Sequence, residues 1–294
     1  MQTELLADRP SAAGGDGTRV LHRLDVRTGP TGEGDGRGRH VGIALDVETT
    51  GLNADQDVII ELAVRRFRYD DDGVITNIDK PYAWLEDPGR GLEPHISALT
   101  GLVDRDLVGR EIDEGAATDL LRSASLVIAH HSRFDRIWIE NRLEVARGLS
   151  WACSMEQVDW RAHAGFDGRS LGWLLMQAGF YHDGHRAGAD VDAVIQLLRH
   201  RSAEGRTTMS VMVENAAKPG WIIRAKGADF SVKDLLKARG YRWSAERRVW
   251  WREVGDDDRL GEEFWLAANI YDVAANPKAL GPEFVRVTAR ERFL

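Results

Sequence analysis

Two acidic residues, Asp46 and Glu48, follow the apolar run Val41 to Leu45. Alternate residues of a strand share one face, so this spacing directs both carboxylates into the same small volume. Like charges that close raise each other's pKa and cost stability unless a cation compensates for them. Carboxylate oxygens suit Mg²⁺ or Mn²⁺. The pair therefore predicts a divalent-metal site, although a bare pair of this type is more often a solvated strand end.

A second candidate segment runs from Ala129 to Asp135, with the sequence Ala-His-His-Ser-Arg-Phe-Asp. It follows a short apolar strand and opens a segment of helical periodicity. Asp135 is a candidate metal ligand at the start of that helix. Because Ser132 and Asp135 have the spacing of a helix capping box, capping is the alternative role for Asp135, and the two roles are compatible.

In a third segment, His185 precedes Asp190 by five residues. Apolar residues then recur at helical intervals, at Val191, Val194, Ile195 and Leu198. This periodicity predicts an amphipathic helix with Asp190 in its first turn and His185 in the loop before it. The N-terminus of a helix stabilises an ionised aspartate, the form that binds metal. An ordinary loop histidine is the alternative for His185.

The three segments, in this order, resemble the motifs of the DEDDh exonucleases, the family of the proofreading subunit of bacterial DNA polymerase III. The first motif is similar to Asp46-x-Glu48-Thr49-Thr50-Gly51-Leu52, the second to His130 through Asp135, and the third to His185 through Asp190. His131 stands where the family usually has Asn, and the spacing of the third motif favours Asp190 over Asp192. The resemblance covers roughly residues 41–201.

The resemblance implies a ribonuclease H-like fold and a 3′ to 5′ exonuclease that releases nucleoside 5′-monophosphates. It implies two divalent ions per site, Mg²⁺ or Mn²⁺, bound by Asp46, Glu48, Asp135 and Asp190. His185 would then take a proton from the attacking water, since the unperturbed pKa of histidine is about 6.5. The residues expected to contact the terminal nucleotide are Thr49, Leu52, His130 and His131. Core burial is the alternative for Leu52.

The elements around these motifs predict an α/β fold, a mixed sheet with helices on its faces. The strand at 41–45 is followed by strand-like runs at 58–69 and 74–85 around the turn Asp70-Asp71-Asp72-Gly73, which predicts an antiparallel meander. Helical periodicity marks 113–122, 133–146, 170–179 and 187–200, with short strands at 126–129 and 152–155.

Composition divides the chain into four parts. Residues 1–40 are rich in Gly, Arg and Asp and are expected to be mostly disordered, apart from a short strand that 20–26 could form. The exonuclease domain is expected at 41–205, a polar linker at 206–218, and a small α+β domain at 219–294. In that last domain the pattern predicts strands at 221–225, 248–252 and 284–288 and helices at 231–239 and 259–269, with 287–293 as a docking strand or a tail.

The small domain combines positive charge with aromatic side chains. Between Lys218 and Val254 there are ten basic and four acidic residues, a local charge of +6 in a chain of −8. Interleaved with them are Trp221, Phe230, Tyr241, Trp243, Trp250 and Trp251. Such a mixture follows a phosphate backbone and stacks on bases, so nucleic-acid contact is predicted. The alternative is a scaffold that uses Trp to build its core and carries Lys and Arg on its wet face.

The overall composition narrows the class of protein. The net charge of −8 argues against coating nucleic acid by bulk electrostatics. No stretch approaches the roughly 18 apolar residues of a membrane span. The N-terminus lacks the basic and apolar regions of a secretory signal, and the single Cys153 cannot form an internal disulfide. We therefore expect a cytoplasmic protein with no membrane contact.

The leading hypothesis is an exonuclease acting on single-stranded or frayed DNA 3′ ends, with a role in proofreading or DNA repair and a DNA polymerase as a candidate partner. An exoribonuclease that trims RNA 3′ ends is the alternative within the class, because no motif reports how a 2′-hydroxyl is received. A catalytically silent nucleic-acid-binding or polymerase-tethered scaffold is the alternative outside it. All five catalytic positions are filled, which disfavours that scaffold.

Overall fold

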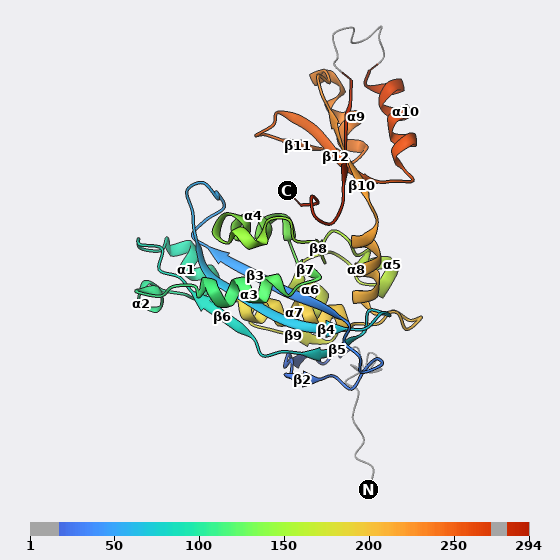
Figure 1. The fold of residues 1–294 in the computed structure, drawn as a ribbon. Coiled ribbons are helices and arrows are strands. Elements are labelled where there is room, and N and C mark those ends of the chain that lie inside the picture. The colour runs from blue at the N-terminus through green and yellow to red at the C-terminus, as the bar shows by residue number, and fades with distance from the viewer. Residues whose placement is uncertain (1–17, 272–280, 294) are drawn as a thin grey trace. The chain divides into compact units, whose positions relative to one another are not determined.

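The computed structural model describes residues 18–271 and 281–293, which fall into two compact units. The first unit ends at Asn215 and also includes Phe293, and the second extends from Ala216 to Arg292 (Figure 1). Of the segment 1–40 that was predicted to be mostly disordered, residues 1–17 lie outside the described residues, and 18–40 are described. Within the described ranges, no helix combines the length and the apolar character that a membrane crossing requires.

The first unit is built on a seven-stranded mixed sheet, whose central strand is β3 (His40–Thr49). Strand β3 runs antiparallel to β4 (Ile59–Tyr69) and parallel to β7 (Leu126–Ala129), which in turn runs parallel to β8 (Trp151–Cys153). On the far side of β4 lie β5 (Ile75–Ile78), β6 (Tyr82–Leu85) and β2 (Gly29–Pro30). The sheet and its antiparallel meander confirm the predicted fold class.

Helices cover both faces of this sheet (Figure 1). Successive side chains of β3 point to opposite faces, and most of them are buried. Ile43, Leu45 and Val47 point to one face and pack against α3 (Glu114–Arg122) and α4 (Ser132–Arg142). The other face of β3 and β4 is covered by α7 (Ala187–Arg199). The even-numbered residues of β3, including both of its acids, therefore lie on the α7 side.

Short elements complete the first unit. The helices are α1 (Pro94–Thr100), α2 (Asp104–Leu107), η1 (Glu144–Ala146), α5 (Trp160–Ala164), α6 (Leu171–Gln177) and α8 (Thr208–Ala217). A parallel pair is formed by β1 (His22–Arg23) and β9 (Phe180–Tyr181). Three features differ from expectation. The run 74–85 is split into β5 and β6, the helical segment 133–146 is split into α4 and η1, and α8 occupies most of the stretch 206–218 expected as a linker.

Residues 26–28 are attached to the sheet by a buried arginine. Arg65 of β4 donates hydrogen bonds to the Val26 carbonyl (2.8 Å) and to Thr28 Oγ1 (3.2 Å). Its other terminal nitrogen lies 2.5 Å from Asp192 of α7. A buried guanidinium needs such partners because an unpaired charge is costly there. This part of the N-terminal segment thus has a fixed structural role, and Asp192 serves as an ion-pair partner.

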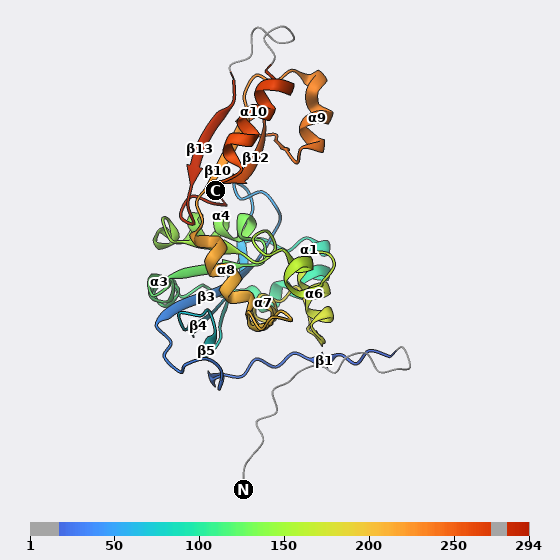
Figure 2. The ribbon, with the colours of Figure 1, turned by 90° about the vertical axis from the view of Figure 1, so that its right-hand side faces the viewer.

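The second unit has the order β10 (Gly220–Ala225), η2 (Phe230–Val232), α9 (Lys233–Ala238), β11 (Arg242–Ser244), β12 (Val249–Gly255), α10 (Arg259–Asn269) and β13 (Glu283–Val287). Its antiparallel sheet has the strand order β11-β12-β10-β13. This is the split β-α-β-β-α-β arrangement. Both helices pack on one face of the sheet, where Leu236 and Leu266 meet Ile223 (Figure 2). The predicted α+β character is confirmed.

Candidate active site

The first two acids lie at the end of β3, beside an irregularity in the sheet. Glu48 stands directly opposite Glu61 of β4, and the register then shifts, so that Thr49 pairs with Ile59. Such a β-bulge inserts one extra residue and turns the strand, and bulges are common beside active sites. Asp46 and Glu48 share the α7 side of β3, as their spacing predicted.

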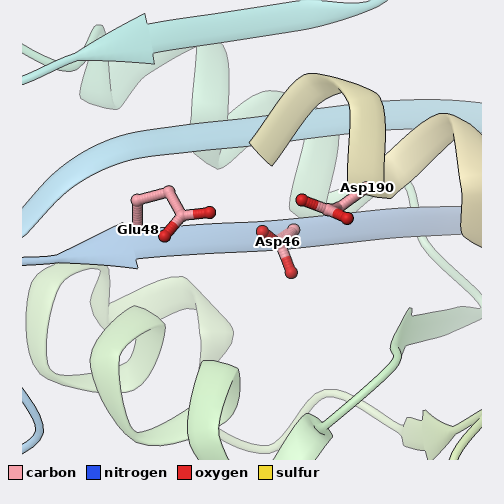
Figure 3. Close-up of side chains that lie close together, drawn as sticks. All are labelled: Asp46, Glu48 and Asp190. Carbon is pink, nitrogen blue, oxygen red and sulfur yellow. The ribbon is translucent and has the colours of Figure 1, made fainter. Parts of the chain in front are cut away.

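Asp190 joins this pair from the first turn of α7. Carboxylate oxygens of Asp46, Glu48 and Asp190 all lie within 4.8 Å of one another (Figure 3). The helix is seated by its buried apolar stripe, which includes Val191, Val194 and Leu198 and presses it against β3 and β4. Packing of that stripe holds the acidic residue over the strand end.

Asp135 is buried in the first turn of α4 and reaches the same strand. One of its oxygens, Oδ1, accepts a hydrogen bond from the backbone N–H of Val47 at 3.2 Å. The capping box considered for it is not formed, because α4 already begins at Ser132, so His131 is the N-cap residue, and no side chain caps this helix. Asp135 is absent from the three-carboxylate cluster, yet its charge is close enough to raise the pKa of Asp46.

The electrostatics of the cluster are those of crowded negative charge. Burial, and then the charges of Asp135 and Asp190, hold the pKa of Asp46 well above its usual range. Burial followed by repulsion from Asp190 and Glu61 raises the pKa of Glu48 to about 8. Burial raises the pKa of Asp135 to about 7. Such groups lose their charge at neutral pH unless a cation stabilises it.

These carboxylates fit a divalent cation. They are hard oxygen donors that converge from β3 and α7, and the pKa values of Asp46 and Glu48 are raised, as expected of crowded carboxylates without a cation. Asp46, Glu48 and Asp190 have the geometry for one ion. Asp135 lies outside this cluster and interacts electrostatically with Asp46.

Glu61 connects the cluster to the start of α7. Its buried carboxylate accepts hydrogen bonds from Arg186 Nε (3.1 Å) and Nη2 (3.2 Å), and from the backbone N–H of Ala187 (3.3 Å). Arg186 also lowers the pKa of Glu48, against the stronger effects that raise it. The Glu61–Arg186 pair therefore fixes the helix that carries Asp190.

Two histidines lie in the loop before α7, and only one of them contacts a carboxylate of the cluster. His182 Nε2 lies 2.8 Å from Asp190 Oδ1, and both side chains are mostly buried. His185 is exposed, has a left-handed backbone (φ 63°), and forms no hydrogen bond or ion pair within the described residues. Sequence reasoning missed His182, since its eight-residue spacing from Asp190 matches no motif.

The four residues predicted to contact the terminal nucleotide have different environments. Leu52 is 88% exposed, which excludes core burial, whereas Thr49 is buried and donates to the Gly51 carbonyl at 2.5 Å. His131 is exposed and stacks on Phe134 with a centroid distance of 6.2 Å. The surface character of Leu52 and His131 is compatible with substrate contact.

His130 is engaged inside the protein. Nε2 lies 2.7 Å from the Arg169 carbonyl, which can only accept, so Nε2 carries the proton and Nδ1 accepts from Ser154 Oγ at 2.8 Å. Burial lowers the pKa of His130 to about 4, consistent with this neutral tautomer. Both ring nitrogens thus join β7 to the segments around Ser154 and Arg169.

A protein-family model described as "Exonuclease" matches residues 43–198, more than half of the chain. The matched range begins on β3 and ends on α7, so it contains all four carboxylates. The chain belongs to this exonuclease family. The enzyme class predicted from the motifs is confirmed at the level of the family.

The exonuclease is similar to curated proteins named ribonuclease T. The protein from Shewanella oneidensis is 26% identical over 148 residues, which cover 46% of this chain and 63% of that protein. The protein from Shewanella baltica is 27% identical over the same coverage. The chain therefore spans less than two thirds of the length of these relatives. They belong to the wider superfamily that the motifs indicated and do not single out the proofreading subunit.

Solved structures of exonucleases are similar to this exonuclease at a lower level. E. coli exonuclease I in complex with an oligonucleotide has a TM-score of 0.47 and 16% identity, covering 82% of this chain and 72% of that chain. Exonuclease X in complex with a 5′ overhanging duplex has a TM-score of 0.40 and 20% identity, covering 57% of this chain and 99% of that chain. Both TM-scores are below 0.5.

Proposed function

We propose that this exonuclease removes nucleotides one at a time from single-stranded or frayed DNA 3′ ends, in a reaction that depends on divalent metal ions. The observation that carries the proposal is the convergence of Asp46, Glu48 and Asp190, whose oxygens lie within 4.8 Å of one another. Clustered carboxylates, here with the pKa values of Asp46 and Glu48 raised, are the arrangement that phosphoryl-transfer sites use to hold metal.

Two bound divalent ions, Mg²⁺ or Mn²⁺, would supply charge stabilisation to the attacking and leaving oxygens of an in-line displacement. Asp46 would help to hold both ions, together with Glu48 and Asp190 for the one that activates the attacking water and with Asp135 for the other. The overall reaction adds water across the terminal phosphodiester bond. The products are a nucleoside 5′-monophosphate and a strand that ends in a free 3′-hydroxyl.

The protein's own residues provide orientation and proton transfer. His185, in the exposed loop before α7, is the general base that we assign to the attacking water. His182 holds Asp190 in its ligand orientation through the 2.8 Å contact. Leu52, an exposed apolar side chain beside the bulge, offers a surface on which the terminal base can rest, and His131 is a second exposed contact.

RNA 3′ ends are the second candidate substrate. The observation that favours them is that the curated relatives are named ribonuclease T. Parallel digestion of DNA and RNA oligonucleotides of one sequence separates the two candidates. Faster release of nucleotides from DNA supports the proposal, whereas a clear preference for RNA replaces it with the trimming of RNA 3′ ends.

A role beside a DNA polymerase, in proofreading or repair, is a finer part of the proposal. It predicts that a mismatched primer end is shortened faster than a paired one, because a frayed terminus enters the site without strand separation. Equal rates on the two primers would argue against proofreading while leaving the exonuclease activity intact.

A further inference from the structure

The basic residues of the second unit fall into two groups. In the first group, carboxylates neutralise the charge: Arg224 and Lys226 each lie 2.8 Å from Glu283, and Arg239 and Arg252 lie 3.1 and 3.2 Å from Glu262. The second group consists of Lys233, Lys237, Arg247, Arg248 and Arg286, which form no ion pair within the described residues. Apart from Arg286 on β13, the uncompensated charge therefore lies on α9 and in the turn between β11 and β12.

Aromatic side chains are joined to the two lysines in a continuous row. Lys233 Nζ lies 4.1 Å from the ring centroid of Phe230, and Lys237 Nζ lies 6.0 Å from that of Trp250. Trp250 lies across the hairpin from Trp243, with 5.5 Å between ring centroids. Lys233 and Lys237, four residues apart, share one side of α9. We call these five residues the aromatic–lysine row.

Both ends of the row are aromatic and exposed. Phe230 is 76% exposed and Trp243 is 50% exposed. The core beneath them is already filled by side chains such as Ile223, Leu236 and Leu266, with Trp250 packed partly against it. Packing against the core thus accounts for Trp250, whereas Phe230 and Trp243 expose large apolar surfaces to water. Exposed apolar surfaces of this kind commonly mark binding sites.

The opposite face of the small sheet is a poorer candidate. Ile222, Val249 and Val287 point to that face and are buried. Glu253, on the same face, is paired with Arg292 at 2.6 Å. Arg224 is paired there as well, and Arg242 lies 5.8 Å from the ring centroid of Trp251, so most of the charge on this face is already engaged.

We propose that the aromatic–lysine row binds single-stranded nucleic acid. Bases stack on Trp243 and Phe230, the two exposed rings, and Lys233 and Lys237, which lie between these rings in the row, contact the phosphates. The inference rests on the proposed function and extends it: the second unit retains the strand while its 3′ end is shortened.

Binding by the full-length chain carrying Asp46→Ala tests the proposal, since this change removes cleavage. The probe is a fluorescent single-stranded oligonucleotide longer than about 16 nucleotides, in DNA and RNA versions, without divalent metal. Trp243→Ala and Phe230→Ala are each expected to weaken binding by about 5- to 100-fold. Lys233→Gln and Lys237→Gln are each expected to reduce the slope of log affinity against log salt by about 0.7.

Matched controls come from the same unit. Phe264 is 68% exposed on α10 and lies outside the row, so Phe264→Ala should leave the affinity unchanged. Trp243→Phe keeps a stacking ring and should recover most of the affinity. If Trp243→Ala does not fold, the two lysine variants test the proposal in its place. Lys237 is exposed and Lys233 is half-buried, so neither change should prevent folding.

An unchanged affinity and salt slope in the row variants would overturn the proposal, as would an equal loss in Phe264→Ala. Binding of proteins without binding of oligonucleotides would overturn it in favour of a protein-docking surface. The proposed function is tested by a separate measurement, metal-dependent cleavage by the wild type. A protein that cleaves normally but binds as well without the row refutes only the inference, and one that binds through the row but never cleaves refutes only the function.

Discussion

Asp190 Oδ1 lies 2.8 Å from His182 Nε2, whereas the motif histidine, His185, is exposed in the same loop. A carboxylate that binds metal with one oxygen is commonly held by a hydrogen bond to the other. The two histidines therefore have separable roles. Under the proposed mechanism, His182 positions Asp190 as a metal ligand and His185 acts on the attacking water.

Removal of His182 should weaken metal binding more than the chemical step. For His182→Ala we expect a loss of about 10- to 100-fold in metal affinity, with kcat at saturating metal close to that of the wild type. His182→Gln retains a donor and should recover part of the affinity. Metal titrations of activity, together with calorimetry, measure both quantities.

His185→Ala is the matched comparison. It should lower kcat by about 10²- to 10⁴-fold with little change in metal affinity, because a general base acts on the reaction and not on the ion. The opposite pattern, in which the His182 variant loses kcat and the His185 variant loses metal, would reverse the two assignments.

Arg186 compensates the buried charge of Glu61, so Arg186→Ala should destabilise the fold. We expect a loss of about 1–2 kcal/mol in the free energy of unfolding, less than for a fully buried pair because the Arg186 side chain is 47% exposed. Urea denaturation measures it. The double variant Arg186→Ala with Glu61→Gln removes the unpaired charge and should recover stability, so a double variant less stable than Arg186→Ala would refute this role.

Stability without metal should fall as the pH rises. The pKa of Glu48 is raised to about 8 and that of Asp135 to about 7, above the value of about 4 in an unfolded chain. Between those values the folded protein binds more protons than the unfolded chain, so the free energy of unfolding decreases with pH and levels off above about 8. Thermal unfolding in a chelator should show a lower Tm at high pH.

Two comparisons isolate the contribution of the cluster to this pH dependence. Glu48→Gln removes one of the raised groups and should flatten the dependence of Tm on pH. Added Mg²⁺ or Mn²⁺ should raise the Tm most at high pH, because the ligands must be deprotonated to bind. A Tm that is independent of metal at every pH would contradict the metal site.

Leu52 should matter for the substrate and not for the fold. Because its side chain is 88% exposed, Leu52→Ala should change the free energy of unfolding by less than about 0.5 kcal/mol. It should nevertheless raise KM for a single-stranded substrate several-fold. Val108, 71% exposed outside the site, provides the control Val108→Ala, for which KM should stay the same. Equal effects of the two changes would remove Leu52 from the site.

Much of the architecture was predictable because the spacing of apolar residues in the sequence matches the buried faces of the strands and helices. The apolar run before Asp46 lies within β3, and the helical spacing after Asp190 corresponds to α7, within one residue of its predicted end. The convergence of Asp46, Glu48 and Asp190 was predictable from motif order together with strand and helix periodicity.

Other features depend on tertiary contacts that no local pattern records. Strand β11 has only three residues, Arg242–Ser244, and exists because it pairs with β12. The His182–Asp190 contact depends on how the loop before α7 turns, and the β-bulge after Glu48 depends on the partner strand. The capping role considered for Asp135 was wrong because its carboxylate is taken by the N–H of Val47, from another element.

The most direct test of the metal-dependent exonuclease site is digestion of a 5′-labelled single-stranded DNA with Mn²⁺ or Mg²⁺, by the wild type and by Asp46→Asn. The wild type should produce a ladder that shortens by one nucleotide at a time from the 3′ end and vanishes in a chelator. Asp46→Asn should produce none while unfolding at a Tm no lower than that of the wild type. Full activity of Asp46→Asn, or a wild type that releases no nucleotides with either metal, would contradict the assignment of this cluster.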